Sequence, residues 1–145
     1  MRRTLLGITA TALALFAFAP AAMSRESAAP TLTVKSSSFG RVLFDGRGNA
    51  LYAFTRDAKG RSACYGACAK AWPVYYARGT LRVDPGLKRS LLGTTTRRDG
   101  RQITYAGQPL YYYVGDRKPG QILCQNVAEF GGTWLVVRPS GKLVR

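Results

Sequence analysis

The stretch Leu51–Asp57, LYAFTRD, returns 59 positions later as Leu110–Asp116, LYYYVGD. A glycine-bearing loop, a cysteine and then a tryptophan follow each copy, namely Cys64 and Trp72, then Cys124 and Trp134. Two matching units of this kind can bury their apolar faces against each other. The duplication therefore predicts a tandem-repeat domain, while it leaves the chemistry of the protein open.

The N-terminal residues resemble an export signal, because Arg2 and Arg3 precede an apolar stretch at Leu5–Phe18 and small residues precede a cleavage point after Ser24. The apolar stretch is too short to span a bilayer. We expect a periplasmic or secreted protein, exported by the general secretory or the twin-arginine route. The expected segments are a cleaved signal peptide at 1–24, a flexible leader at 25–31, and a single domain at 32–145 with repeat 1 at about 39–84 and repeat 2 at about 94–141.

The chain is strongly basic, with 22 Lys and Arg against 7 Asp and Glu and a net charge of +15. Such a protein is attracted to polyanions, although a basic surface can also serve only solubility. Outside the cytoplasm the available polyanions are envelope polymers and lipid head groups, so we expect one of these as a partner and no nucleic acid. The densest basic segment, called here the basic cluster, contributes Arg78, Arg82, Lys88, Arg89, Arg97, Arg98 and Arg101.

The composition excludes several kinds of active site. The chain has no histidine, which removes Ser-His-Asp and Cys-His catalysis and imidazole metal ligands. Three cysteines without histidine make an uncommon zinc ligand set, and the Cys64–Cys68 spacing is not a CxxC redox motif. The seven acids form no obvious pair for general acid–base catalysis. We therefore expect no catalytic residue, no metal site and no cofactor.

The pattern of the domain is mainly β. Three pairs of β-rich segments flank turn sequences, as hairpin strands do, and their connections are too short for parallel crossovers. We therefore expect two tandem repeats in a compact antiparallel β domain with two short helices. The expected strand pairs are 41–44 with 50–54, 94–96 with 102–105, and 133–137 with 142–144.

Two segments break this β pattern. Cys64, Cys68 and Trp72 recur every four residues, so a short helix would place all three on one face. Residues 85–92 predict a second helical turn. Both helices should be brief, because prolines and glycines flank them.

Several motifs together resemble one bacterial family. They are the pattern Tyr-x-aromatic-x-x-Asp at Tyr52/Phe54/Asp57 and Tyr111/Tyr113/Asp116, the run from Ser62 through Cys64, Gly66 and Cys68 to Trp72-Pro73, Arg98-Asp99-Gly100, and Gly107-x-Pro109-Leu110-Tyr111. Over about residues 39–141 the chain resembles the "secreted repeat of unknown function" family, whose members include predicted lipoproteins. The resemblance implies an extracytoplasmic tandem-repeat domain with no established activity. The first cysteine is Cys64, far from the signal end, so we expect no lipid anchor.

The repeated motif has two interpretations. On a strand its two aromatic residues point to the same face, and its aspartate follows where the chain turns. The motif could build a paired aromatic core in which each aspartate bonds loop amides. Alternatively, the aspartates could form a symmetric ion or ligand site between the copies, helped by tyrosine hydroxyls. The ligand-binding residues would then be Tyr52, Phe54, Asp57, Tyr111, Tyr113 and Asp116.

The other aromatic residues divide between core and surface. Trp72 and Trp134 are expected in the core. Tyr112 lies between two inward-facing tyrosines and should face outward, where an aromatic ring could stack on a sugar or enter a membrane interface.

Export to an oxidising compartment predicts at least one disulfide. Spacing alone leaves the pairing open, because Cys64 and Cys68 need a distorted turn at Gly66, whereas a bond to Cys124 would close a loop of about 60 residues. The family resemblance favours Cys64–Cys68, with Cys124 buried and unreactive.

Two function classes follow from these observations. The first is a non-enzymatic exported envelope or secreted binding or interaction module of unknown ligand, for which anionic envelope polymers are the candidates. The alternative is a thiol-redox or soft-metal-binding protein that uses Cys64, Cys68 and Cys124.

Overall fold

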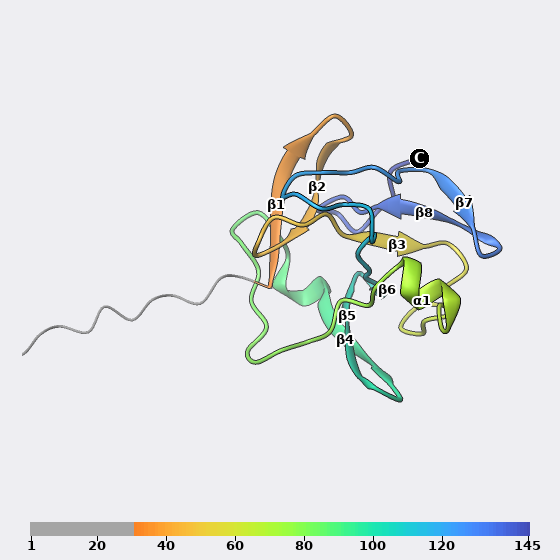
Figure 1. The fold of residues 1–145 in the computed structure, drawn as a ribbon. Coiled ribbons are helices and arrows are strands. Elements are labelled where there is room, and N and C mark those ends of the chain that lie inside the picture. The colour runs from red at the N-terminus through yellow and green to blue at the C-terminus, as the bar shows by residue number, and fades with distance from the viewer. Residues whose placement is uncertain (1–30) are drawn as a thin grey trace, which may run out of the picture.

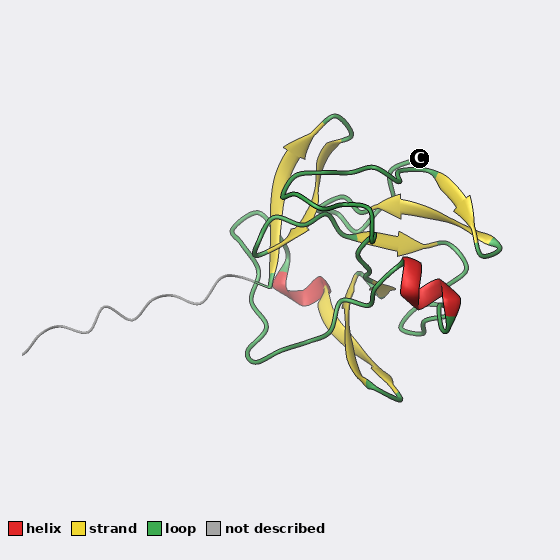
Figure 2. Ribbon diagram, in the orientation of Figure 1, coloured by secondary structure: helices red, strands yellow, loops and turns green. Residues whose placement is uncertain are grey.

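A computed structural model describes residues 31–145, so the expected signal peptide and nearly all of the leader lie outside the described residues. The chain forms three small sheets with two very short helices (Figures 1 and 2). The mainly antiparallel β class predicted from the sequence is confirmed. The strands are β1 Leu32–Ser37, β2 Gly40–Asp45, β3 Tyr52–Phe54, β4 Leu92–Arg97, β5 Gly100–Tyr105, β6 Gln108–Pro109, β7 Val127–Glu129 and β8 Gly132–Val136, and the helices are α1 Ala67–Ala71 and the 3₁₀ helix η1 Arg89–Leu91.

Each repeat forms an equivalent β-hairpin in the structure. In the first, β1 pairs with β2 from Leu32↔Asp45 to the turn. In the second, β4 pairs with β5 from Leu92↔Tyr105, which is the same register 60 positions later. Figure 1 shows these hairpins at opposite ends of the molecule, with β3 and β8 between them. The two repeats therefore place equivalent strands on either side of a shared centre.

The expected pairing of 41–44 with 50–54 is wrong in part. The turn is present, because Phe44 bridges Ala50 and the Leu51 N–H donates to the Leu43 carbonyl at 3.2 Å. However, β2 pairs with β1, and β3 leaves the turn to pair with β8. The sequence did not predict β1 or β7, because serines weaken the strand pattern of the first and the second has only three residues.

Both expected helices are shorter than predicted. Cys64 lies before α1, because Gly66 has a φ of +55°, a left-handed conformation that interrupts a regular helix, and α1 begins only at the next residue. Within 85–92, the helical part is confined to η1, and Leu92 already pairs with Tyr105 as the first residue of β4. Sheet pairing thus overrides the local helical pattern.

The two repeats are interlocked. Strand β3 of the first copy pairs with β8 of the second, and β8 pairs in turn with β7. Tyr52 and Tyr111 form an antiparallel bridge in which each backbone N–H donates to the carbonyl of the other at 2.9 Å. In the described part of the chain, no helix is long and apolar enough to cross a membrane.

Candidate functional site

The two copies of the Tyr-x-aromatic-x-x-Asp motif exchange hydrogen bonds at the centre of the domain. Tyr52 Oη donates to Asp116 Oδ2 at 2.7 Å, and Tyr111 Oη donates to Asp57 Oδ2 at the same distance. Each tyrosine therefore bonds the aspartate of the other copy. Both rings are fully buried, so these bonds lie at the interior seam between the repeats.

The second oxygen of each carboxylate holds the loop that follows it. The Ala63 N–H donates to Asp57 Oδ1 at 2.7 Å, and the Leu123 N–H donates to Asp116 Oδ1 at 3.0 Å. Burial raises the pKa of both carboxyl groups above the usual value, while these hydrogen bonds oppose the rise. The motif aspartates thus bond loop amides, as the first interpretation of the motif requires.

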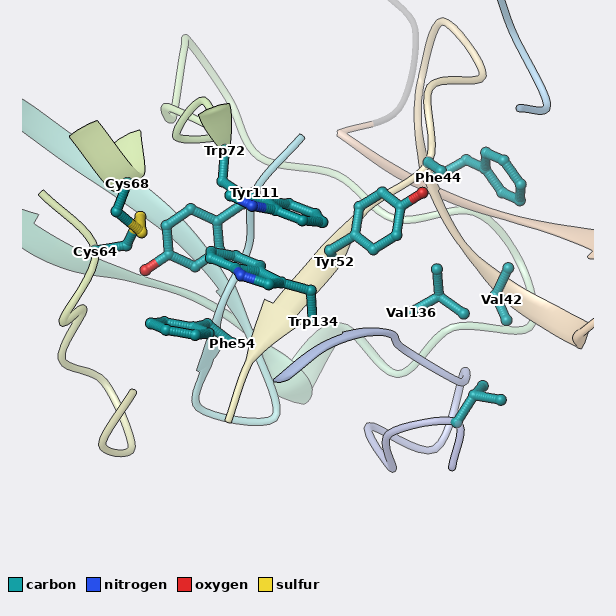
Figure 3. Close-up of a cluster of buried hydrophobic side chains, with 12 residues drawn as sticks. Val42, Phe44, Tyr52, Phe54, Cys64, Cys68, Trp72, Tyr111, Trp134 and Val136 are labelled. Carbon is teal, nitrogen blue, oxygen red and sulfur yellow. A yellow bond between two sulfur atoms is a disulfide. The ribbon is translucent and has the colours of Figure 1, made fainter. Parts of the chain in front are cut away.

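Four aromatic rings form a continuous stack that alternates between the repeats. Trp72 and Trp134 are stacked at 3.9 Å between ring centroids with 1° between their planes (Figure 3). Phe54 stacks on Trp134 at 4.2 Å, and Tyr113 tilts over Trp72 at 4.8 Å. The aromatic residue of each motif therefore packs on the tryptophan of the other copy. Both tryptophans are fully buried, and the expectation that they lie in the core is confirmed.

The indole nitrogens break the symmetry of this stack. Trp72 Nε1 donates to Glu129 Oε2 at 3.0 Å. Trp134 Nε1 is buried, and no residue between 31 and 145 accepts its hydrogen bond. The two tryptophans thus differ in hydrogen bonding although their rings stack in parallel.

Cys64 and Cys68 form a disulfide with their Cα atoms 5.3 Å apart, as the family resemblance implied. Both are buried in the aromatic cluster. Cys124 is free and half-buried, less covered than expected, and burial raises the pKa of its thiol while a hydrogen bond with Tyr113 opposes that rise. Among residues 31–145, no three His, Cys, Asp or Glu side chains gather as a metal site would require. Within residues 31–145, the thiol or soft-metal alternative would have Cys124 as its free thiol.

Arg97 does not belong to an exposed basic surface, contrary to its placement in the basic cluster. Its side chain is buried and donates to Gln102 Oε1 at 3.2 Å, to the Cys64 carbonyl at 2.9 Å and to Ser62 Oγ. Tyr111 Oη lies 2.6 Å from the same Ser62 oxygen. Arg97 therefore connects the second hairpin to the disulfide loop, a contact between distant segments that local sequence patterns do not reveal.

The remaining members of the basic cluster are distributed between two environments. Arg78 and Arg82 line a cavity, which is described below. Arg101 is exposed and donates to Thr94 Oγ1 at 2.8 Å across the β4–β5 ribbon. The other exposed members are Lys88, Arg89 and Arg98.

A cavity of about 850 Å³ lies beside the turn that follows β2. Three arginines and three tyrosines line it. Tyr112, expected on the outside of a strand, is half-buried in its wall and donates to Asp45 Oδ2 at 3.0 Å. Its principal lining residues are Arg47, Arg78, Arg82, Tyr75, Tyr76 and Tyr112.

A second cavity, of about 330 Å³, adjoins the first. Asp45, Arg47 and Tyr112 line both cavities. The second also includes Tyr113 and Asp116, two of the ligand-binding candidates from the repeated motif. The other four candidates, Tyr52, Phe54, Asp57 and Tyr111, are absent from its lining. Sequence reasoning missed Arg47, although its place in a turn between two strands marked it as exposed.

The chain was compared with known families and proteins. The family described as a secreted repeat of unknown function matches residues 33–75 and 93–138. No curated protein and no solved structure matches the chain significantly. The first matched segment contains Tyr52 and Asp57, and the second contains their hydrogen-bonding partners Tyr111 and Asp116. Because the matched segments make up more than half of the chain, the protein belongs to the family of secreted repeats of unknown function.

Proposed function

We propose that this protein is a non-enzymatic exported binding module whose ligand is an anionic polymer of the cell envelope. One observation carries the proposal. The net charge is +15, yet the only ion pair within residues 31–145 joins Arg97 to Asp99. Basic groups in excess of the acidic groups attract polyanions, and they do so most strongly where a concave surface concentrates the field.

The carboxylates support a binding role over a catalytic one. Asp45, Asp57 and Asp116 each accept several hydrogen bonds from side chains or loop amides. A general acid or base must be able to exchange its proton with a substrate. These three carboxylates instead hold turns and connect repeats, which is a structural use of an acidic group.

We further propose that the mature protein is periplasmic or secreted without a lipid anchor. The absence of a cysteine before Cys64 supports this proposal. The intact mass of the exported protein should correspond to a chain that begins near Arg25. A mass that includes an acyl group, or residues 1–24, would contradict the proposal.

The binding proposal is tested with immobilised polygalacturonate, a carboxylated glycan, and uncharged dextran as the matched control. The protein should bind polygalacturonate at an ionic strength of about 0.01 M and lose affinity at about 0.15 M, because the Debye length falls from about 30 Å to about 8 Å. Dextran should retain no protein. Failure to bind polygalacturonate at low salt, or equal binding to dextran, would reject the function.

A further inference from the structure

The two cavities beside the β2 turn are neighbours, because Asp45, Arg47 and Tyr112 line both, and together they are called the groove here. Their volumes of about 850 and 330 Å³ lie in the range of ligand-binding clefts. Arg78 lines the larger cavity, Tyr113 lines the smaller one, and Arg47 lines both. Two neighbouring cavities of this size offer room for more than one unit of a polymer.

We propose that this groove is the binding site, and that its ligand is an acidic polysaccharide whose carboxylate groups lie against Arg47 and Arg78 while its sugar rings pack on the tyrosines. This inference rests on the proposed function and deepens it, because it assigns the site and the class of polymer.

Two of the three arginines of the groove, Arg47 and Arg78, are available to a ligand. Arg47 and Arg78 are exposed, and neither side chain forms an ion pair or a hydrogen bond with residues 31–145. The backbone of Arg47 is held in place, because its N–H donates to Asp45 Oδ1 at 2.9 Å. The planar guanidinium of an arginine binds a carboxylate through paired hydrogen bonds.

The acidic wall residue Asp45 does not offset these arginines in the way a free carboxylate would. It is 5% exposed, and its Oδ1 accepts hydrogen bonds from the Arg47 and Asn49 backbone N–H groups. Its Oδ2 accepts from Asn49 Nδ2 at 2.9 Å and from Tyr112 Oη at 3.0 Å. Asp45 therefore organises the wall of the groove, and it forms no ion pair with Arg47 or Arg78.

The tyrosines give the groove fixed, uncharged ring surfaces. Tyr75 Oη donates to the Thr31 carbonyl at 2.6 Å, Tyr112 Oη to Asp45, and Tyr76 Oη to Asp99. These bonds anchor the hydroxyl ends, while the half-buried rings line the groove. Burial and the nearby Asp45 raise the pKa of Tyr75 to about 12, so this hydroxyl stays neutral beside an anion. Aromatic faces of this kind pack well against the apolar faces of sugar rings.

The groove favours a glycan over a membrane surface. A membrane-binding face combines basic groups with exposed apolar side chains that enter the lipid interface. In the described part of the chain, the large exposed hydrophobic residues are Tyr65, Val114, Leu123 and Phe130, and none of them lines the groove. The smaller cavity instead carries Asn49, whose side-chain oxygen can accept a hydrogen bond from a sugar hydroxyl, and Asp116, whose two oxygens are already bonded to Tyr52 and Leu123.

The test uses calorimetric titration of the full mature protein with oligogalacturonate, and with its methyl ester, which has the same sugar rings without charge. Arg47→Gln should weaken binding of the acid about tenfold, as expected for loss of one charge-assisted contact. Arg98→Gln is the matched control, because Arg98 is exposed, lies outside both cavities and makes the same change in net charge. It should weaken binding less than about twofold. The methyl ester should bind at least about tenfold more weakly than the acid.

A second variant tests the stacking surface. Tyr76→Leu keeps an apolar side chain and the net charge but removes the ring, so it should weaken binding of oligogalacturonate about fivefold without changing its salt dependence. Circular dichroism and the unfolding midpoint should match those of the unmodified protein. If Tyr76→Leu alters the fold, Tyr76→Phe, which retains the ring, should bind as well as the unmodified protein.

The outcomes separate the two proposals. Equal losses in Arg47→Gln and Arg98→Gln would overturn the groove assignment and leave anionic-polymer binding intact. No binding of oligogalacturonate or polygalacturonate by the unmodified protein would overturn the proposed function itself. Binding to phosphatidylglycerol vesicles that oligogalacturonate does not displace would replace the glycan with a membrane surface. Equal binding of the methyl ester would reject an acidic ligand.

Discussion

Tyr52 donates a 2.7 Å hydrogen bond to Asp116, a residue of the other repeat 64 positions away. Tyr111 and Asp57 make the equivalent bond in the opposite direction. A repeated motif that bonds across copies, and not within one, makes each copy dependent on the other. This reciprocity determines how the protein should respond to mutation.

Removing the hydroxyl of Tyr52 or of Tyr111 should destabilise the domain. The loss of unfolding free energy should be larger for Tyr111. Tyr52→Phe deprives Asp116 of a donor and should lower the free energy of unfolding by about 1–2 kcal/mol. Tyr111→Phe should cost about 2–3 kcal/mol, because its hydroxyl also contacts Ser62 in the buried Arg97 network. Denaturant titration measures both. Tyr65→Phe, at a ring 53% exposed, is the control and should change stability by less than about 0.5 kcal/mol.

Neither repeat should fold alone. A fragment of residues 32–84 contains β3 but lacks β8, with which β3 pairs, and it lacks Trp134, on which Phe54 stacks. So short a chain also buries too little apolar surface to compensate. The fragment should show no cooperative thermal transition by circular dichroism. A sharp transition from this fragment alone would contradict the interlocked arrangement.

Phe54 and Tyr113, the two outer rings of the stack, should contribute unequally to the free energy of unfolding. Phe54 is 1% exposed and lies flat on Trp134, so Phe54→Ala should cost about 3–5 kcal/mol. Tyr113 is half-buried and tilted by 38° over Trp72, so Tyr113→Ala should cost about half as much. Equal losses in chemical denaturation would mean that the stack is packed alike at both ends.

Alkaline pH should destabilise the protein through its buried tyrosines. Burial raises the pKa of Tyr52, Tyr111 and Tyr112 above the usual 10.0, and that of Tyr75 to about 12. Below pH 10 both states are protonated and the stabilising contribution is complete. Above it the unfolded chain loses protons that the folded chain retains, so the free energy of unfolding falls as pH rises.

This pH dependence is measured by denaturant unfolding between about pH 8 and pH 11, together with the absorbance of ionised tyrosine. Tyr75→Phe should reduce the slope of the fall above pH 10, because one titrating group has been removed. An identical slope in this variant would show that Tyr75 does not contribute to the loss.

The Cys64–Cys68 disulfide should contribute modestly to the free energy of unfolding. It closes a loop from Cys64 to Cys68, for which the chain-entropy relation gives about 2 kcal/mol. Replacing both cysteines by alanine should lower the free energy of unfolding by about that amount. The unmodified protein, denatured without reductant, should titrate one thiol, that of Cys124. Three reactive thiols would revive the thiol-redox alternative.

The sequence alone was sufficient to predict the duplication, the mainly β fold class and the β4–β5 hairpin. A strand alternates its faces every residue and a turn has a characteristic composition, so Tyr52 with Phe54, and Asp99-Gly100 at the β4–β5 turn, could be interpreted locally. The family resemblance added the Cys64–Cys68 disulfide, which spacing could not decide.

The tertiary structure decided which segments meet. Local periodicity indicates the face on which a side chain lies, but it does not indicate the strand or side chain opposite. For this reason the pairing of β3 with β8, the exchange of bonds between Tyr52 and Asp116, and the burial of Arg97 required the assembled domain. The groove has the same origin, because Arg47, Arg78 and Tyr112 come from three separate segments that converge only when the two repeats interlock.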